Sequence, residues 1–335
     1  MKQPENLQLT STEVAALWTQ YMNDSLAICT LQYFLSQVKD GEIRPVVAFG
    51  LELSQKHIAS ITQIFNAEGI PIPIGLTDHD VKRNAPPLYA DSFALRYMRH
   101  IAKITMAIYG TATAEAVRQD IRNFYYSCGK SAMELYEQVM QVLLSKGLYI
   151  RAPYIPKQKQ VSFVESPSFL GGILGNNRPL NAVELAHIFG NIQANGVGRA
   201  LLIGFGQVAA SQEVRQYMVR GQDIAKKHSE VLSNLIKDDD LSLPKSWDSE
   251  VTDSTVAPFS DKLMMQHTTT LTAVSMGNYG LALGSSTRVD IAADYMRLMA
   301  EVGQFGEDGV QLMIKNRWLE QPPQAADRKE LALSR

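Results

Sequence analysis

Residues 200–211 read ALLIGFGQVAAS, an apolar run followed by the pattern Gly-x-Gly-x-x-Ala. In dinucleotide-binding proteins this pattern follows a β-strand and begins a helix, so that the backbone can approach a pyrophosphate. Here the glycines lie inside, or at the end of, a helical pattern that starts near Asn181, and residues 29–40 of the first half contain no matching glycine pair. We therefore interpret them as sites of close helix packing or of a helix end, and expect an all-α protein without a nucleotide site.

The composition predicts a folded protein with a net charge close to zero. Its 335 residues are 45% hydrophobic and 20% charged, which suits two ordinary domains, and a net charge of −2 argues against nucleic acid as a partner. The N-terminus lacks the apolar core of a secretory signal, and the apolar stretch 197–210 is too short to cross a bilayer. Cys29 and Cys128 lie among helix-spaced apolar residues. We expect a cytoplasmic protein with reduced thiols and without membrane insertion.

The two halves of the chain match each other. A shift of 171 residues, which becomes 170 after one deletion, aligns identical or similar residues in order along about 145 positions. The matches include Leu9 with Leu180, Glu13 with Glu184, Lys56-His57 with Lys227-His228, Pro73 with Pro244, Pro87 with Pro258, Arg118 with Arg288, and Tyr125 with Tyr295. We infer a tandem duplication, with one domain at 1–150, a linker rich in Pro, Gly and Asn at 151–179, and a second domain at 180–335.

Apolar spacing predicts four helices in each copy, the number in a four-helix bundle. The first helix of each copy starts with a capping box, in which Glu13 or Glu184 follows Thr10 or Asn181 by three residues. The remaining helices are expected near 45–66, 91–109 and 114–146 in the first copy, and near 213–237, 260–283 and 287–318 in the second.

The connections predict the order of the helices in space. Helices one and two are joined tightly around residues 39–44, and helices three and four around Gly110 to Thr113. About twenty residues rich in Pro and Gly, 68–88, separate helices two and three. Because an extended chain of that length reaches about 60 Å, it can run the length of a bundle. We therefore expect two ferritin-like bundles, each with a long crossover between helices two and three.

A ferritin-like fold raises the question of a metal centre. Di-iron bundles use Glu-x-x-His pairs, and the chain contains none. His228 lies on the apolar face of its helix and is expected to face an inward Glu301, whereas His57 has Ser131 in the corresponding place. We favour a hydrogen-bonded polar pair in a core over a divalent metal site. The residues that would hold a metal are His228 and Glu301, with weaker participation of His57, His100 and His267.

Several segments resemble a family of domains of unknown function numbered 3231, found chiefly in spore-forming bacteria. They are GFGQVAASQEVRQYMVRG (204–221), KKH (226–228), APFSDKLMM (257–265) and NRWLEQPPQAADR (316–328), with a weaker echo at GLYIRAP (147–153). The resemblance covers essentially the whole chain. It implies tandem ferritin-like four-helix bundles in a cytoplasmic or spore-associated protein, and it supplies no catalytic residues.

Three functional hypotheses follow. The first is a non-enzymatic helical protein, connected with sporulation or stress, that acts by self-association or by binding another protein. The second is a divergent ferritin-like metal binder or oxidase. The third is a protein that holds a small apolar ligand between helices. Nucleophilic catalysis has no support, since no Gly-x-Ser-x-Gly motif occurs and neither cysteine has a histidine beside it in sequence. We also expect the linker to dock on a bundle through its apolar residues, Phe163, Phe169, Leu170, Ile173 and Leu174.

Overall fold

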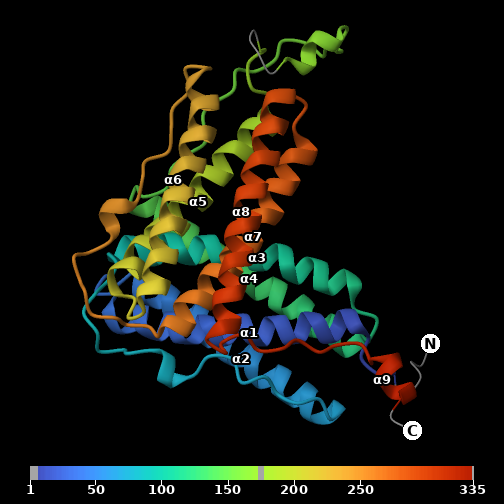
Figure 1. Ribbon diagram of the computed structural model, residues 1–335. Helices are drawn as coiled ribbons and strands as arrows, with labels where there is room; N and C mark the ends of the chain where they lie inside the picture. The colour runs from blue at the N-terminus through green and yellow to red at the C-terminus, as the bar shows by residue number, and fades with distance from the viewer. Residues whose placement is uncertain (1–6, 173–176, 334–335) are drawn as a thin grey trace.

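The computed structural model describes residues 7–172 and 177–333, and within them the regular secondary structure is helical apart from two isolated β-bridges. Figure 1 shows the second bundle rising from the first at a wide angle. The first bundle comprises α1 (Ser11–Gln37), α2 (Ile43–Glu68), α3 (Asp91–Glu115) and α4 (Gln119–Ser145), and the second α5 (Ala182–Val208), α6 (Gln212–Lys237), α7 (Asp261–Ser285) and α8 (Val289–Lys315). A short α9 (Arg328–Leu333) was not predicted. The predicted all-α fold of two four-helix bundles is confirmed; the exact domain boundaries stay a prediction.

Long crossovers join α2 to α3 and α6 to α7, as predicted, and the other connections within each bundle are short. The predicted connection at Gly110 to Thr113 is wrong, because both residues lie within α3, which continues to Glu115. A carboxylate from another helix sets the true boundary. Glu13 Oε1 accepts hydrogen bonds from the backbone N–H groups of Val117 (2.9 Å) and Arg118 (2.7 Å), directly before α4 begins.

The two capping boxes form as predicted. Thr10 accepts from the backbone N–H of Glu13, whose carboxylate accepts from the backbone N–H of Thr10, and Asn181 and Glu184 repeat this arrangement. Glu184 also accepts from the backbone N–H groups of Thr287 and Arg288, as Glu13 does before α4. Each of these buried glutamates therefore caps the start of its bundle's first and fourth helices, which is a structural role.

The two crossovers pair with each other across a pseudo-two-fold axis. Val81 forms an antiparallel bridge with Phe259, and Tyr89 forms one with Val251. The hydrogen bonds repeat at a shift of 170: Lys82 N donates to Pro258 O as Thr252 N donates to Leu88 O, and Ser260 N donates to Asp80 O as Ala90 N donates to Glu250 O. The deletion that changes the shift from 171 to 170 therefore lies before Val81, not after Pro87.

Helices α3 and α7 meet near this axis. The Tyr97 hydroxyl lies 3.2 Å from His267 Nε2, and these two residues are equivalent positions of the two copies. Each contacts an aromatic ring of its own bundle's first helix: Phe34 for Tyr97, at 5.4 Å between ring centroids, and Phe205 for His267, at 5.7 Å. Buried residues of both bundles thus form one continuous core around the axis.

Gly204, from the glycine pattern at 200–211, lies inside α5 at a close contact between the bundles. A methyl group added there would overlap the hydroxyl of Tyr89 and lie 2.6 Å from its Cζ atom. Tyr89 cannot easily move, since its ring stacks on Phe93 and its hydroxyl donates to Leu201 O at 2.9 Å. The equivalent position in the first bundle is Tyr33, which packs against Phe259. The glycine at Gly204 therefore permits a close contact, as predicted, but its partner is the crossover residue Tyr89 and not another helix.

The expectation that the linker docks on a bundle is wrong at Phe163, whose side chain is 87% exposed. Leu170 is 45% exposed, while Phe169 lies under the guanidinium of Arg178, 4.0 Å from the ring centroid. Ile173 and Leu174 lie outside the described residues. The linker is therefore exposed around Phe163 and is attached near its end, where Asn177 donates to Asp290 and Arg178 covers Phe169.

We predict that Gly204→Ala lowers the free energy of unfolding by about 1–3 kcal/mol, the usual range for overpacking a core. Gly198→Ala is the matched control on the same helix, because nothing lies within 4 Å of its added methyl group. It is expected to raise stability by about 0.5–1 kcal/mol through helix propensity. Urea denaturation of both variants measures this, and equal effects would contradict the assigned contact.

Candidate functional site

Each bundle has a polar centre around the histidine of its second helix. In the second bundle His228 is 1% exposed; its Nε2 lies 3.2 Å from Glu301 Oε2 and its Nδ1 3.2 Å from the Tyr279 hydroxyl. Asn195 Nδ2 donates to that hydroxyl at 2.8 Å. Burial lowers the pKa of His228 despite Glu301. A neutral imidazole fits, since it can donate to Glu301 and accept from Tyr279.

The first bundle has a charged version of this centre. His57 Nδ1 lies 3.2 Å from Asp24 Oδ2, and Asp24 occupies the place of Asn195. Burial opposes a charge on His57, but its hydrogen bonds with Asp24 and Cys128 outweigh burial and raise its pKa to about 10. Asp24 is the largest influence that favours the charged form of His57, so this histidine is cationic at pH 7, whereas burial outweighs Glu301 at His228 and leaves it neutral.

The five residues considered for a metal site do not converge. His228 and Glu301 meet, but Glu301 is also bound by Lys227, at 2.8 Å, and lies 3.8 Å from Arg297. His267 faces Tyr97, and His100 lies on α3 of the other bundle. Among the described residues, no group of three His, Cys, Asp or Glu side chains is placed to hold a metal ion. A metal role for these residues stays a prediction.

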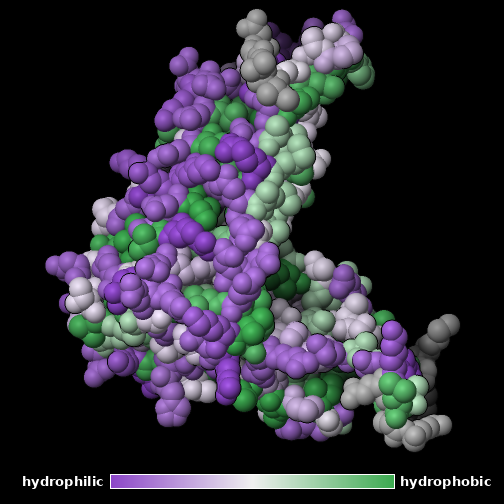
Figure 2. Space-filling view, viewed as in Figure 1, coloured by the Kyte–Doolittle hydropathy of each residue, from purple (hydrophilic) through white to green (hydrophobic). Residues whose placement is uncertain are grey.

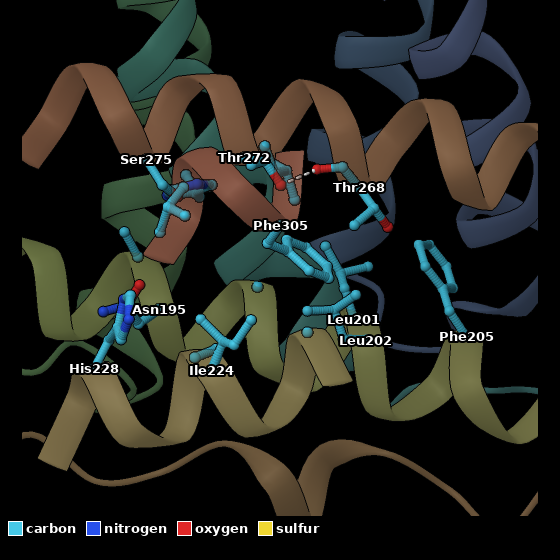
Figure 3. Close-up of a pocket in the computed structure, with 17 residues that line it drawn as sticks. Asn195, Leu201, Leu202, Phe205, Ile224, His228, Thr268, Thr272, Ser275 and Phe305 are labelled. Carbon is cyan, nitrogen blue, oxygen red and sulfur yellow. Dashed lines mark hydrogen bonds between the residues drawn. The ribbon is translucent and has the colours of Figure 1, made fainter. Parts of the chain in front are cut away.

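A narrow cavity lies inside the second bundle, next to His228 (Figure 3). Its volume is about 70 Å³. His228 and Asn195 stand at one end and Phe205 at the other, with Leu201, Leu202 and Phe305 between them. Thr268, Thr272 and Ser275 of α7 line one side of the cavity, and the hydroxyls of Thr268 and Thr272 donate to backbone carbonyls of their own helix. The rest of the cavity's body is apolar.

A larger cleft of about 540 Å³ lies between the bundles. It occupies the corner where α3 and α7 diverge beyond the contact of Tyr97 with His267, and Figure 2 shows this corner as a re-entrant angle of the surface. Residues of α3, α5 and α7 line it, together with the segment Leu148 to Ile150 that follows α4. The volume is in the range of small-molecule sites in proteins.

One wall of the cleft is basic. The α3 residues Arg96, Arg99, His100 and Lys103 all line it, because positions three, four and seven apart share a helix face. Arg96 is neutralised by Glu250, at 3.0 Å. Arg99 and Lys103 have no carboxylate partner within 4.0 Å in the described parts of the chain, and no Asp or Glu of those parts lines the cleft.

The hydrogen bonds of Arg99 leave donors unused. Its Nη1 donates to Gln193 Oε1 at 3.1 Å and its guanidinium lies 5.3 Å from the centroid of the Tyr149 ring, while its Nε has no partner among the described residues. Burial and the nearby Arg99 lower the pKa of Lys103. Burial and the same two cations lower the pKa of His100 to about 4, so that this histidine is neutral at pH 7.

The second copy shows that the fold does not require these charges. At the shift of 170 that relates α3 to α7, Arg96, Arg99, His100 and Lys103 correspond to Gln266, Thr269, Thr270 and Ala273. The same helix therefore folds and packs in the second bundle with four uncharged residues. Two like charges four residues apart, as at Arg99 and Lys103, destabilise an isolated helix. The basic wall is therefore a feature of this cleft rather than of the bundle.

Of the residues in the basic wall, only His100 was predicted as a site residue from the sequence. The sequence signal for this wall is RYMRHIAK, residues 96–103. Its basic residues share one helix face, and none of them has an acidic residue four positions away. What the sequence did not reveal is that this face meets α5 and α7 of the other bundle.

Taken together, the fold defines a class: all-α proteins made of two tandem four-helix bundles joined through their crossovers. A family model described as "Protein of unknown function (DUF3231)" matches residues 1–161 and 168–331, and the chain belongs to this family. The predicted family resemblance is thereby confirmed. No curated protein sequence matches the chain.

The chain is also similar to a solved structure, the crystal structure of a "putative spore coat protein" from Bacillus halodurans C-125. The match has a TM-score of 0.43 and 14% sequence identity, and covers 46% of this chain and 100% of that chain. Among the described residues, every helix is too short or too polar to span a lipid bilayer.

We predict that the charge on His57 makes stability depend on pH. Its pKa is about 6.5 unfolded and about 10 folded, so its stabilisation is complete below pH 6.5 and is lost as pH rises through 10. Asp24→Asn should lower the free energy of unfolding at pH 6 by about 3 kcal/mol, the lower end for breaking a buried pair, and flatten the fall toward pH 10. Urea denaturation between pH 6 and 10 measures this. The exposed Asp253→Asn is the control; parallel profiles for Asp24→Asn and the unmodified chain would contradict the prediction.

Proposed function

We propose that this protein is a binding protein, not an enzyme, and that it holds a small organic anion in the cleft between its bundles. The observation that carries the proposal is the pair of cations, Arg99 and Lys103, that line the cleft without a carboxylate partner in the described residues. Arg99 is half-buried, and a half-buried charge is normally paired. Lys103 is exposed at the edge of the cleft and adds a second positive charge beside it. An anion beside them would supply the missing partner and accept the free donors of Arg99.

The surroundings of the two cations suit binding better than catalysis. The cleft's histidines, His100 and His187, both have lowered pKa values because burial and the charge on Lys103 disfavour their protonated forms. Neutral histidines add no charge and can still donate one hydrogen bond each. The polar lining includes no carboxylate among the described residues, so no acid stands opposite these histidines to make an acid–base pair.

A second candidate function is the association with another protein, or with further copies of this chain, that the sequence suggested. Its support is the linker, where Val161 is 86% and Phe163 87% exposed, since exposed apolar side chains close together are typical of interaction sites. Association with a spore layer or with stress is a proposal from the family resemblance. Limited proteolysis with and without a candidate partner tests it: protection of residues 157–165 supports association, and unchanged cutting opposes it.

The anion proposal is tested with variants that copy the second bundle into the first. Arg99→Thr and Lys103→Ala install the residues that α7 carries at the equivalent positions, so the helix is expected to fold. With inorganic phosphate and acetate as probes in isothermal titration calorimetry, each variant should raise Kd by roughly tenfold, equivalent to about 1.4 kcal/mol. Affinity should also fall as salt rises, because the cleft is open to solvent.

Lys130→Ala is the matched control, because it removes the same charge from an exposed position of α4 outside the cleft. It should leave the Kd unchanged. Weak binding that all three variants share equally would show a general effect of charge and would overturn the proposal, as would no binding of either anion to the unmodified protein at low salt.

A further inference from the structure

We propose that the ligand is an amphipathic anion: one carboxylate or phosphate head at Arg99 and Lys103, and an unbranched hydrocarbon chain whose end enters the cavity of the second bundle. This inference rests on the proposed function, since it needs the anion site. It specifies the chemical class of the ligand, and it links two spaces that are otherwise separate features of the fold.

The size of the cleft exceeds what an anion needs. A carboxylate or phosphate displaces roughly two to four waters, or about 60–120 Å³ at about 30 Å³ each. The cleft holds about 540 Å³, so most of it lies beyond the head group. A ligand limited to its charged part would leave this remainder to water.

The remainder of the cleft is mostly apolar and partly exposed, with His187, Asn191 and Asn278 among its polar residues. Opposite the cations, α7 contributes Val274, Gly277 and Leu281, and α3 continues beyond Lys103 with Ile104 and Ile108. Leu281 is 63% exposed and Ile108 43%. Large apolar side chains that line a cleft and stay exposed are expected where an apolar ligand surface covers them.

The cleft and the cavity share a wall. His100 of α3 and Ala194 of α5 line both the cleft and the 70 Å³ cavity of the second bundle. On the cavity side, the next residue of this face of α5 is Gly198, and nothing lies within 4 Å of a methyl group placed there, so the cavity is open beside Ala194. The space beyond lies between Leu201, Ile224 and Phe305, with the hydrogen-bonded Thr268 and Thr272 on its α7 side. It has room for about two groups of the size of a water molecule, roughly 30 Å³ each, and therefore for a short hydrocarbon end.

The basic cleft and the apolar cavity together determine the direction in which the ligand's hydrocarbon chain would lie. The cations hold the head in the cleft, and the apolar cavity next to Ala194 receives the tail. Asn195 and His228 stand at the end of the cavity next to Ala194 and satisfy each other through Tyr279, so they do not require a polar ligand group. The tail would pass them and continue toward Leu201 and Phe305. A hydrocarbon end therefore fits this cavity better than a second polar group does.

The test is a chain-length series in calorimetry: acetate, butyrate, hexanoate, octanoate and decanoate, with octyl phosphate to separate the two kinds of head. Each added CH₂ should lower Kd by about fourfold, from about 0.8 kcal/mol per buried methylene, until the cavity is full. The ratio of the acetate and decanoate Kd values is the readout. Ala194→Leu should reduce that ratio by at least tenfold, whereas Ala182→Leu, which adds the same bulk at an exposed position of α5, should keep it.

A second measurement does not depend on a variant. In crystals soaked with 10-bromodecanoate, the anomalous peak of bromine should lie inside the second bundle, between Ala194 and Phe305. If the acetate and decanoate Kd values are nearly equal, or if the bromine peak lies in the open cleft, the hydrocarbon proposal is wrong. The proposed anion site still stands in that case, provided that the short anions bind. If no anion of any length binds, the proposed function itself fails.

Discussion

The constraint on which the rest depends is the antiparallel pairing of the two crossovers. Val81 with Phe259 and Tyr89 with Val251 join segments about 170 residues apart, and backbone hydrogen bonds repeat on both sides of the axis. A connection that would otherwise be a long surface loop thereby satisfies its backbone polar groups in the centre of the molecule. This pairing sets where α3 and α7 meet, at Tyr97 and His267, and where they diverge to leave a cleft. The relative position of the bundles follows from the crossovers and not from the linker.

Duplication also provides an internal comparison. Where both copies keep a feature, the fold requires it: Glu13 and Glu184 cap the same two helices in each bundle. Where the copies differ, the fold tolerates either form. Asp24 and Asn195 leave one buried histidine charged and the other neutral, and Tyr33 and Gly204 are alternative ways to fill the same interface. The basic residues of α3 belong to this second group, which is why we assign them to binding rather than to stability.

Such asymmetry is the expected outcome of joining two equivalent units in one chain. Two separate, identical subunits must carry the same residue at both related positions. In a single chain, the two copies can carry different residues at equivalent positions. Tyr89 can therefore fill the space beside Gly204, and α3 can carry Arg99 and Lys103 while α7 carries uncharged residues there. A cleft with a charged wall on one side and an apolar wall on the other therefore becomes accessible to a duplicated fold.

The sequence by itself determined the helices, the caps, the long crossovers and the duplication, because periodicity and capping are local and each is repeated. The sequence also predicted that His228 and Glu301 face each other inside one bundle, because both lie on inward faces at similar heights along their helices. Only the tertiary structure decided that α3 extends past Gly110, that the linker residue Phe163 stays exposed, and that Arg99 and Lys103 line a cleft. These features depend on groups that are distant in sequence. Glu13 binds the backbone N–H groups that precede α4, and α5 packs near α3 to line the cleft. Apolar spacing records which face of a helix is buried, but not which distant helix covers it.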